Sequence, residues 1–155
     1  MRPFDTYPGG GRELLGQAKG SNSRHEYGRK LMQLSGQRKC AYCETDLTGS
    51  YEQWLTMVVD HVVPKSHCGA AGIPVRWYED LSNMVLACAA CNSFRNRYRC
   101  DWATQPTSLD EFYALRDKVF TERKQLIDAS HRTERAFYDT KPWEISNRDT
   151  TVASA

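Results

Sequence analysis

The chain has 155 residues, of which 40% are hydrophobic and 11% aromatic, enough for one modest core but not for two independent domains. It lacks a run of about 20 apolar residues, so the sequence predicts neither a membrane span nor a membrane partner. The net charge of +2 is too small to require a nucleic-acid partner. The distribution is uneven, because residues 1–100 carry 13 Lys and Arg against 9 Asp and Glu, whereas residues 101–155 carry 8 against 10.

Residues 1–20 contain two prolines and three consecutive glycines, whose backbone entropy disfavours regular structure. We therefore predict a flexible N-terminal arm. A helix is predicted to follow it, because Ser23 to Glu26 has the form of a capping box, apolar residues then recur at helical spacing, and Gly36 supplies a stop.

Two Cys-x-x-Cys pairs come next, Cys40 with Cys43 and Cys88 with Cys91. Each pair is a tight turn that presents two thiolates to one ion, and four thiolates complete the tetrahedral shell of a structural zinc site. Two disulfides, or one redox-active pair beside an inert pair, are the alternatives. The absence of an apolar signal segment at the N-terminus favours a reducing cytoplasm, where thiols bind metal.

Between the pairs, residues 54–59 and 62–63 are rich in β-branched and aromatic side chains. This composition predicts the two strands of a hairpin, with Asp60 and His61 inside the pairing region or at its bend. The pair would then be rigidly mounted.

Residues 67–74 are rich in glycine and small residues and are predicted to form a loop, and residues 75–80 one helical turn. Cys68 in this loop and Cys100 beyond the last Cys-x-x-Cys pair are interpreted as free thiols.

A second capping-box pattern, from Ser108 to Glu111, begins a segment with apolar residues on one face. It predicts a long amphipathic helix, either a surface for dimerisation or a partner, or a helix packed on the core. The second interpretation is favoured, because one apolar face is what core packing requires.

The order of these motifs carries a resemblance. The first Cys-x-x-Cys pair is followed by VDHVVP at residues 59–64, by LSNMVL at residues 81–86, and by the second pair with Asn92 directly after it. Over about residues 38–99 the chain resembles the HNH endonucleases of the ββα-metal fold, in their four-cysteine, zinc-supported form. The resemblance implies an α+β fold with a ββα-metal core, and the N-terminal helix and the long C-terminal helix predicted above would flank it. The expected organisation is an arm at 1–20, a nuclease core at 21–100, a helical extension at 101–140 and a polar tail at 141–155.

Phosphodiester hydrolysis needs a deprotonated water, a cation at the scissile phosphate and relief for the leaving 3′ oxygen. His61 suits the general base, and Asp60 and Asn92 offer the oxygen ligands that Mg²⁺ or Mn²⁺ prefers. In the family pattern the position of Asn83 stabilises the loop and helps to orient the base. Either Asn83 or a backbone carbonyl is expected to hold the second imidazole nitrogen. Where the family offers Asn or His, Asn92 favours Mg²⁺ or Mn²⁺ over zinc or nickel.

Arg95 and Arg99, one turn apart if their segment is helical, and Lys65 are candidate contacts to DNA phosphates; the alternative is a basic face in water. The leading hypothesis is a cytoplasmic endonuclease acting on DNA, with RNA less favoured. Its specificity would come from the flanks or from a partner protein, in restriction, phage defence or a mobile element. The second hypothesis is a non-catalytic zinc module for binding nucleic acid or protein, which has no need of all three of Asp60, His61 and Asn92.

Overall fold

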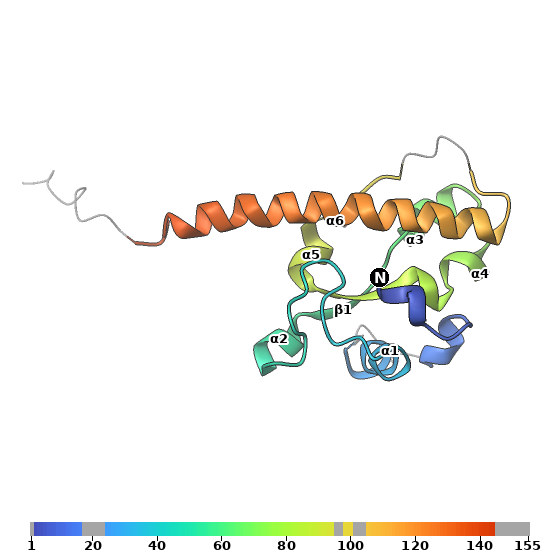
Figure 1. The fold of residues 1–155 in the computed structure, drawn as a ribbon, viewed down its shortest axis with the longest axis horizontal. Coiled ribbons are helices and arrows are strands. Elements are labelled where there is room, and N and C mark those ends of the chain that lie inside the picture. The colour runs from blue at the N-terminus through green and yellow to red at the C-terminus, as the bar shows by residue number, and fades with distance from the viewer. Residues whose placement is uncertain (1, 17–23, 95–97, 101–104, 145–155) are drawn as a thin grey trace, which may run out of the picture.

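The computed structural model describes residues 2–16, 24–94, 98–100 and 105–144 (Figure 1). Among these residues no helix is both long enough and apolar enough to cross a membrane. The elements in chain order are η1 (Pro3–Thr6), η2 (Arg12–Leu15), the π-helical turn η3 (Arg24–Gly28), α1 (Arg29–Ser35), α2 (Tyr51–Leu55), β1 (Met57–His61), α3 (Lys65–Ala70), α4 (Val75–Tyr78), η4 (Leu81–Asn83), β2 (Met84–Cys88), α5 (Ala89–Phe94) and α6 (Leu109–Asp139).

The core of the fold is an antiparallel pair of strands followed by a helix. β1 pairs with β2 from Met57 opposite Cys88 to His61 opposite Met84. All five residues of β2 are buried, whereas β1 is mostly half-buried. α5 begins directly after β2 and contacts both strands. The predicted α+β class with a ββα core and a long C-terminal helix is therefore confirmed.

The predicted hairpin within residues 54–63 is wrong. Trp54 lies in α2, which Ser50 caps by accepting a hydrogen bond from the Gln53 amide at 3.2 Å. Val62 and Val63 follow β1 and are fully buried, so their apolar character reflects core burial and not strand pairing. The actual partner, β2, lies beyond the two helices α3 and α4.

The region between the strands is more helical than its composition suggested. The predicted loop at residues 67–74 is largely replaced by α3, which begins after Pro64, and Gly72 then turns the chain with a positive φ of 69°. The helical turn predicted within residues 75–80 is confirmed as α4. Pro64 precedes α3 in an extended conformation, and its carbonyl accepts the amides of His67 at 3.0 Å and Cys68 at 3.1 Å, which closes the first turn of the helix.

The N-terminal helix is confirmed as η3 and α1. Leu31 is fully buried, and Gly36 ends the helix in the left-handed region, at φ 71°, with its amide bonded to the Met32 carbonyl at 2.8 Å. Ser23, the expected cap, lies outside the described residues.

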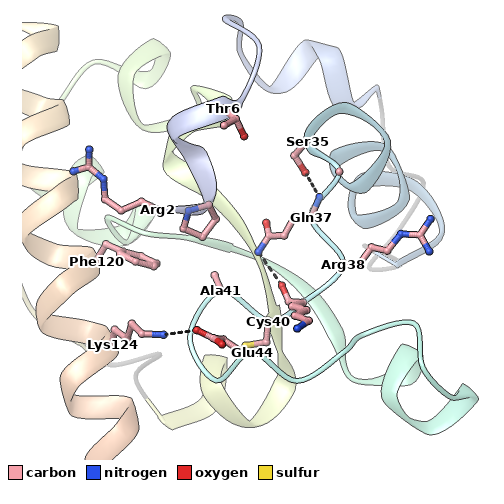
Figure 2. Close-up of a pocket in the computed structure, with 13 residues that line it drawn as sticks. Arg2, Thr6, Ser35, Gln37, Arg38, Cys40, Ala41, Glu44, Phe120 and Lys124 are labelled. Atoms are coloured by element: carbon pink, nitrogen blue, oxygen red, sulfur yellow. Dashed lines mark hydrogen bonds and ion pairs between the residues drawn. The ribbon is translucent and has the colours of Figure 1, made fainter.

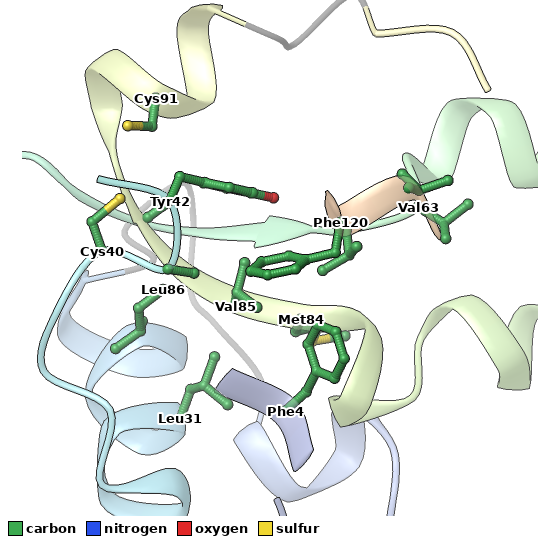
Figure 3. Packing of buried hydrophobic residues seen from close by; sticks show 14 of the residues in the cluster. Phe4, Leu31, Cys40, Tyr42, Val63, Met84, Val85, Leu86, Cys91 and Phe120 are labelled. Carbon is green, nitrogen blue, oxygen red and sulfur yellow. The ribbon is translucent and has the colours of Figure 1, made fainter. Parts of the chain in front are cut away.

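The N-terminal segment, predicted to be a flexible arm, packs on the core where the structure describes it, at residues 2–16. Phe4 and Leu15 are buried, and the Phe4 ring meets Phe120 edge-on at 5.4 Å (Figure 3). The Gly10 carbonyl also accepts the Leu81 amide at 2.9 Å. The segment contains the short 3₁₀ helices η1 and η2, and the two buried apolar side chains anchor it to the core.

The long C-terminal helix α6 packs on the core, as predicted, through its first part. Its buried residues recur every three or four positions and end at Ile127. They are Phe112, Arg116, Val119, Phe120, Arg123 and Ile127. Beyond His131, which still contacts α5, α6 projects away from the rest of the fold (Figure 1).

Phe4→Ala should lower the free energy of unfolding by about 3–5 kcal/mol, because it removes a buried ring and leaves a cavity against Phe120. Urea unfolding followed by circular dichroism measures the change. Leu14→Ala is the control, because Leu14 lies in the same segment but is 38% exposed. Equal, small effects of both substitutions would show that the segment does not anchor the fold.

Candidate active site and metal centre

Four cysteines from two distant turns meet in one cluster. The Sγ atoms of Cys40, Cys43, Cys88 and Cys91 all lie within 4.8 Å of one another. Tetrahedral zinc with Zn–S bonds of about 2.3 Å places its sulfurs about 3.8 Å apart. The Cys43 and Cys88 sulfurs are 3.8 Å apart, so the cluster has the size and the donor set of a four-thiolate metal site.

Backbone contacts hold the first cysteine turn against β2. The Ala41 amide donates to the Leu86 carbonyl at 2.8 Å, and the Cys88 amide points at the Cys40 sulfur at 3.3 Å. Figure 3 shows Cys40 and Cys91 approaching each other from the turn and from α5. Hydrogen bonds from the other three thiols, that of Cys40 first, lower the pKa of Cys43, whereas those with Cys40 and Cys43 raise the pKa of Cys88 and of Cys91. A metal ion must therefore displace protons from the cluster when it binds.

Helix α6 also reaches this cluster, through a residue that the sequence analysis did not select. Nε2 of His131 lies 3.1 Å from Sγ of Cys91, and its ring packs edge-on against Phe94 at 5.0 Å. An imidazole N–H beside a metal-binding thiolate stabilises and orients that ligand. No spacing rule links His131 to a cysteine 40 positions away.

The carboxylate of Asp60 is fixed by two buried side chains. Its Oδ2 accepts a hydrogen bond from the Tyr42 hydroxyl at 2.7 Å and forms an ion pair with Nη2 of Arg123 at 2.8 Å. Burial, reinforced by the negative charge of Asp60, raises the pKa of Tyr42, so its hydroxyl stays protonated and donates. Both contacts fall on one oxygen, and within the described residues Oδ1 makes no hydrogen bond.

Arg123 binds the backbone of the same strand. Nη1 donates to the carbonyls of His61 and Val62, each at 2.8 Å, and the side chain is 1% exposed. One guanidinium on α6 thus fixes three consecutive residues at the end of β1. The sequence analysis missed this role, because an arginine in a long helix is ordinarily exposed. The signal for its burial was its position on the apolar face of the helix, four residues after Val119 and four before Ile127.

The imidazole of His61 faces a second buried carboxylate, that of Glu79. Its Nε2 lies 3.3 Å from Oε2 of Glu79, whose Oε1 accepts from Nζ of Lys65 at 2.6 Å and lies 3.6 Å from Nη1 of Arg12. The hydrogen bond from His61 and that from Lys65 outweigh burial and lower the pKa of Glu79 to about 2. Glu79 is therefore an anion, and it too was missed by the sequence analysis.

Asn83 binds the backbone that follows His61 and not the imidazole. Its Oδ1 accepts the Val63 amide at 2.9 Å, and its Nδ2 donates to the carbonyls of Val63 at 3.2 Å and Tyr78 at 2.9 Å. The side chain is fully buried. Asn83 therefore fixes the loop after the Asp60-His61 pair, and the contact at the ring that we expected from Asn83 or a backbone carbonyl comes from Glu79.

The remaining predicted residues are less closely tied to this site. Asn92 is half-buried on α5, directly after Cys91, and within the described residues no hydrogen bond joins it to Asp60 or His61. Lys65 is engaged by Glu79, and Arg99 is exposed. Arg95 lies outside the described residues. The roles of these four residues stay predictions.

A cavity of about 620 Å³ lies elsewhere (Figure 2). The N-terminal segment, the connection from α1 to Cys40, and α6 enclose it, with Phe120 and Ala41 on its walls and Lys124 at its edge. Asp60, His61, Asn83 and Asn92 do not line it. The candidate chemistry therefore sits at the end of β1, outside this cavity.

The comparisons with known proteins support this assignment over part of the chain. The sequence profile of the family described as HNH endonuclease matches residues 40–97. The matched region spans both cysteine pairs, the Asp60-His61 pair, Asn83 and Asn92. Searches among curated proteins and among solved structures found no match.

Replacing Arg123 should strongly destabilise the protein. Arg123→Met leaves the Asp60 carboxylate, 11% exposed, without its cation and two carbonyls without a donor, which should cost about 3–5 kcal/mol of unfolding free energy. Chemical denaturation measures the loss, with Lys118→Met as the control on the exposed face of the same helix. Adding Asp60→Asn to Arg123→Met should recover part of the loss, and a purely additive double variant would contradict the ion pair.

Proposed function

We propose that this protein, whose residues 40–97 match the HNH endonuclease family, is a metal-dependent endonuclease that hydrolyses DNA phosphodiester bonds. The observation that carries the proposal is the environment of His61. Its imidazole is partly exposed, with 24% of the side chain accessible, and is held by an anionic carboxylate at the end of a strand. The preceding residue, Asp60, is a second fixed carboxylate.

Two metal ions with separate tasks are proposed. Zinc at the four cysteines would be structural, because four thiolates fill its tetrahedral shell and leave no open position. A Mg²⁺ or Mn²⁺ ion at Asp60 and Asn92 would supply positive charge to the scissile phosphate and to the leaving oxygen. The free Oδ1 of Asp60 supports this assignment, because Tyr42 and Arg123 occupy only Oδ2.

The residues of the chain divide the remaining work. His61 would accept a proton from water through its free ring nitrogen, the water oxygen would form the new bond to phosphorus, and the 3′ oxygen would leave with the electron pair of the broken bond. Arg123 and Asn83 would keep Asp60 and His61 in place by fixing the backbone from His61 to Val63. A fixed base needs no reorganisation when the reaction occurs.

Contacts to the DNA backbone are proposed for Lys65, Arg95 and Arg99. Such contacts position a protein without reading bases, so target choice would come from the flanking segments or from a partner protein. DNA is favoured over RNA. A cytoplasmic role in restriction, phage defence or a mobile element fits this activity.

A non-catalytic zinc module is the second candidate. The observation in its favour is that both acidic groups near His61 already have cationic partners, Asp60 with Arg123 and Glu79 with Lys65. A binding module would keep such ion pairs for stability alone. Nicking of supercoiled plasmid in the presence of Mg²⁺ separates the two candidates.

The zinc proposal predicts two separable metal dependences. One zinc per chain should survive mild chelation that abolishes cleavage, because four thiolates bind zinc much more tightly than two oxygen ligands bind Mg²⁺. Elemental analysis measures the zinc. Cys88→Ser should lose zinc and unfold, whereas Cys68→Ala, at a buried cysteine outside the cluster, should retain it. Folded, monodisperse protein free of zinc would refute a structural zinc site.

His61→Ala should lower plasmid cleavage by about 10²–10⁴-fold, the usual contribution of a general base, while zinc content and DNA affinity stay unchanged. Plasmid nicking measures the effect, with His67→Ala as the control histidine. Cleavage by His61→Ala at the wild-type rate would make His61 structural.

Asn92→Ala should weaken Mg²⁺-supported cleavage, and Asn92→His should restore part of it with Mn²⁺ or Ni²⁺, which imidazole suits better. Plasmid nicking titrated with each metal measures this effect.

A further inference from the structure

Glu79 is a buried carboxylate to which the HNH motif, as read from the sequence, gives no task. Only 8% of the residue is exposed, and it lies between α4 and η4, four positions before Asn83. An ionised carboxylate in such a place needs partners, and Glu79 has three, from three different elements: His61 of β1, Lys65 of α3 and Arg12 of η2.

The three partners do not share the same oxygen. Oε1 faces the two permanent cations, Lys65 and Arg12, whereas Oε2 faces only the imidazole of His61. The Lys65 contact alone, at 2.6 Å, is enough to compensate a buried charge at Oε1. The second oxygen is thus left as an acceptor directed at one ring nitrogen.

The backbone of Glu79 is fixed as well. Its carbonyl accepts the Arg12 amide and its amide donates to the Val75 carbonyl, each at 2.9 Å. Lys65 and these backbone bonds hold the carboxylate at a set place beside β1. His61 is therefore placed against a rigid acceptor, which restricts rotation of its ring.

We infer that Glu79 is the positioning residue of the proposed general base. An ionised carboxylate accepts hydrogen bonds and cannot donate them, so Nε2 of His61 must carry the hydrogen that points at Oε2. In the neutral imidazole Nδ1 then has the free lone pair, and it is the nitrogen that takes the proton from water. The Nε2–Oε2 distance of 3.3 Å is longer than the usual value of about 2.9 Å, as is common for catalytic hydrogen bonds before substrate binds.

This inference rests on the proposed nuclease activity, in that it names the residue that orients His61. The simpler alternative is that Glu79 only ties the N-terminal segment to the core. That reading assigns the same importance to the Arg12 contact as to the His61 contact, and the two can be removed separately.

The test uses the full-length, zinc-loaded protein and compares Glu79→Gln with Arg12→Met. Glu79→Gln should lower kcat for plasmid nicking about 10–100-fold, the usual effect of losing such a second partner, with KM for DNA changed less than about threefold. Arg12→Met, which leaves Oε2 and His61 in contact, should keep kcat within about twofold of wild type. Equal losses from both variants, or wild-type kcat for Glu79→Gln, would overturn the inference.

The ring itself is read by nitrogen-15 NMR of the histidine side chains, with the His61 signals assigned by their loss in His61→Ala. Wild type should show the hydrogen on Nε2, and Glu79→Gln should shift the ring toward a mixture of tautomers. Hydrogen on Nδ1 in the wild type would refute the inference even if cleavage is normal. If the wild type cleaves no DNA, the proposed function fails and this measurement alone decides the contact.

Glu79→Asp covers the case in which Glu79→Gln does not fold. It keeps the negative charge for Lys65 and Arg12 but withdraws the carboxylate from His61 by about one methylene length. Folded Glu79→Asp with a similar loss of kcat and the same change in tautomer supports the positioning role, whereas wild-type values for both refute it.

Discussion

The site depends on the contacts that the buried guanidinium of Arg123 makes with the end of β1. A two-stranded sheet is marginal by itself, and the end of β1, where Asp60 and His61 lie, has a strand neighbour on one edge only. Arg123 supplies hydrogen-bond donors that a neighbouring strand would otherwise supply, because its planar group binds two successive carbonyls and a carboxylate at once. Helix α6 is therefore part of the site, although Arg123 is 62 residues beyond His61 in the chain.

The four-cysteine cluster is the second fixed point, and α6 connects it to the first. Lys124, next to Arg123, donates to the Tyr42 carbonyl at 2.6 Å, within the first cysteine turn, and His131 reaches Cys91. One face of a single helix thus contacts the metal-binding turn, the strand with the candidate base, and α5. A metal ion at the cluster would fasten β2 and α5 to the same turn, whose Tyr42 binds Asp60. Metal binding and the geometry of the Asp60 carboxylate are linked through Tyr42.

Local signals in the sequence succeeded where a short stretch of chain decides the outcome. The caps at Gly36 and Ser108 predicted where α1 ends and α6 begins, because a cap is a contact between residues only a few positions apart. The hairpin failed because β propensity identifies a strand but not its partner. Residues 57–59 did form part of a strand, but its partner is Met84–Cys88, a fully buried strand more than twenty residues further along the chain. The packing of the N-terminal segment was not predicted for a related reason, because Phe4 packs against Phe120, a residue more than a hundred positions away.

By itself the sequence determined the types of the candidate ligands and their order along the chain: two thiol pairs, the adjacent Asp60 and His61, and the amides of Asn83 and Asn92. Those follow from chemistry, because the side chains that bind zinc or move a proton are few and their spacing in tight turns is restricted. Only the tertiary structure decided which groups orient them. Glu79, Arg123, Tyr42 and His131 are ordinary residues in their own segments, and their roles arise from burial beside partners far along the chain. A buried charge must find a partner within a few ångströms, and the partner it finds depends on how the segments pack.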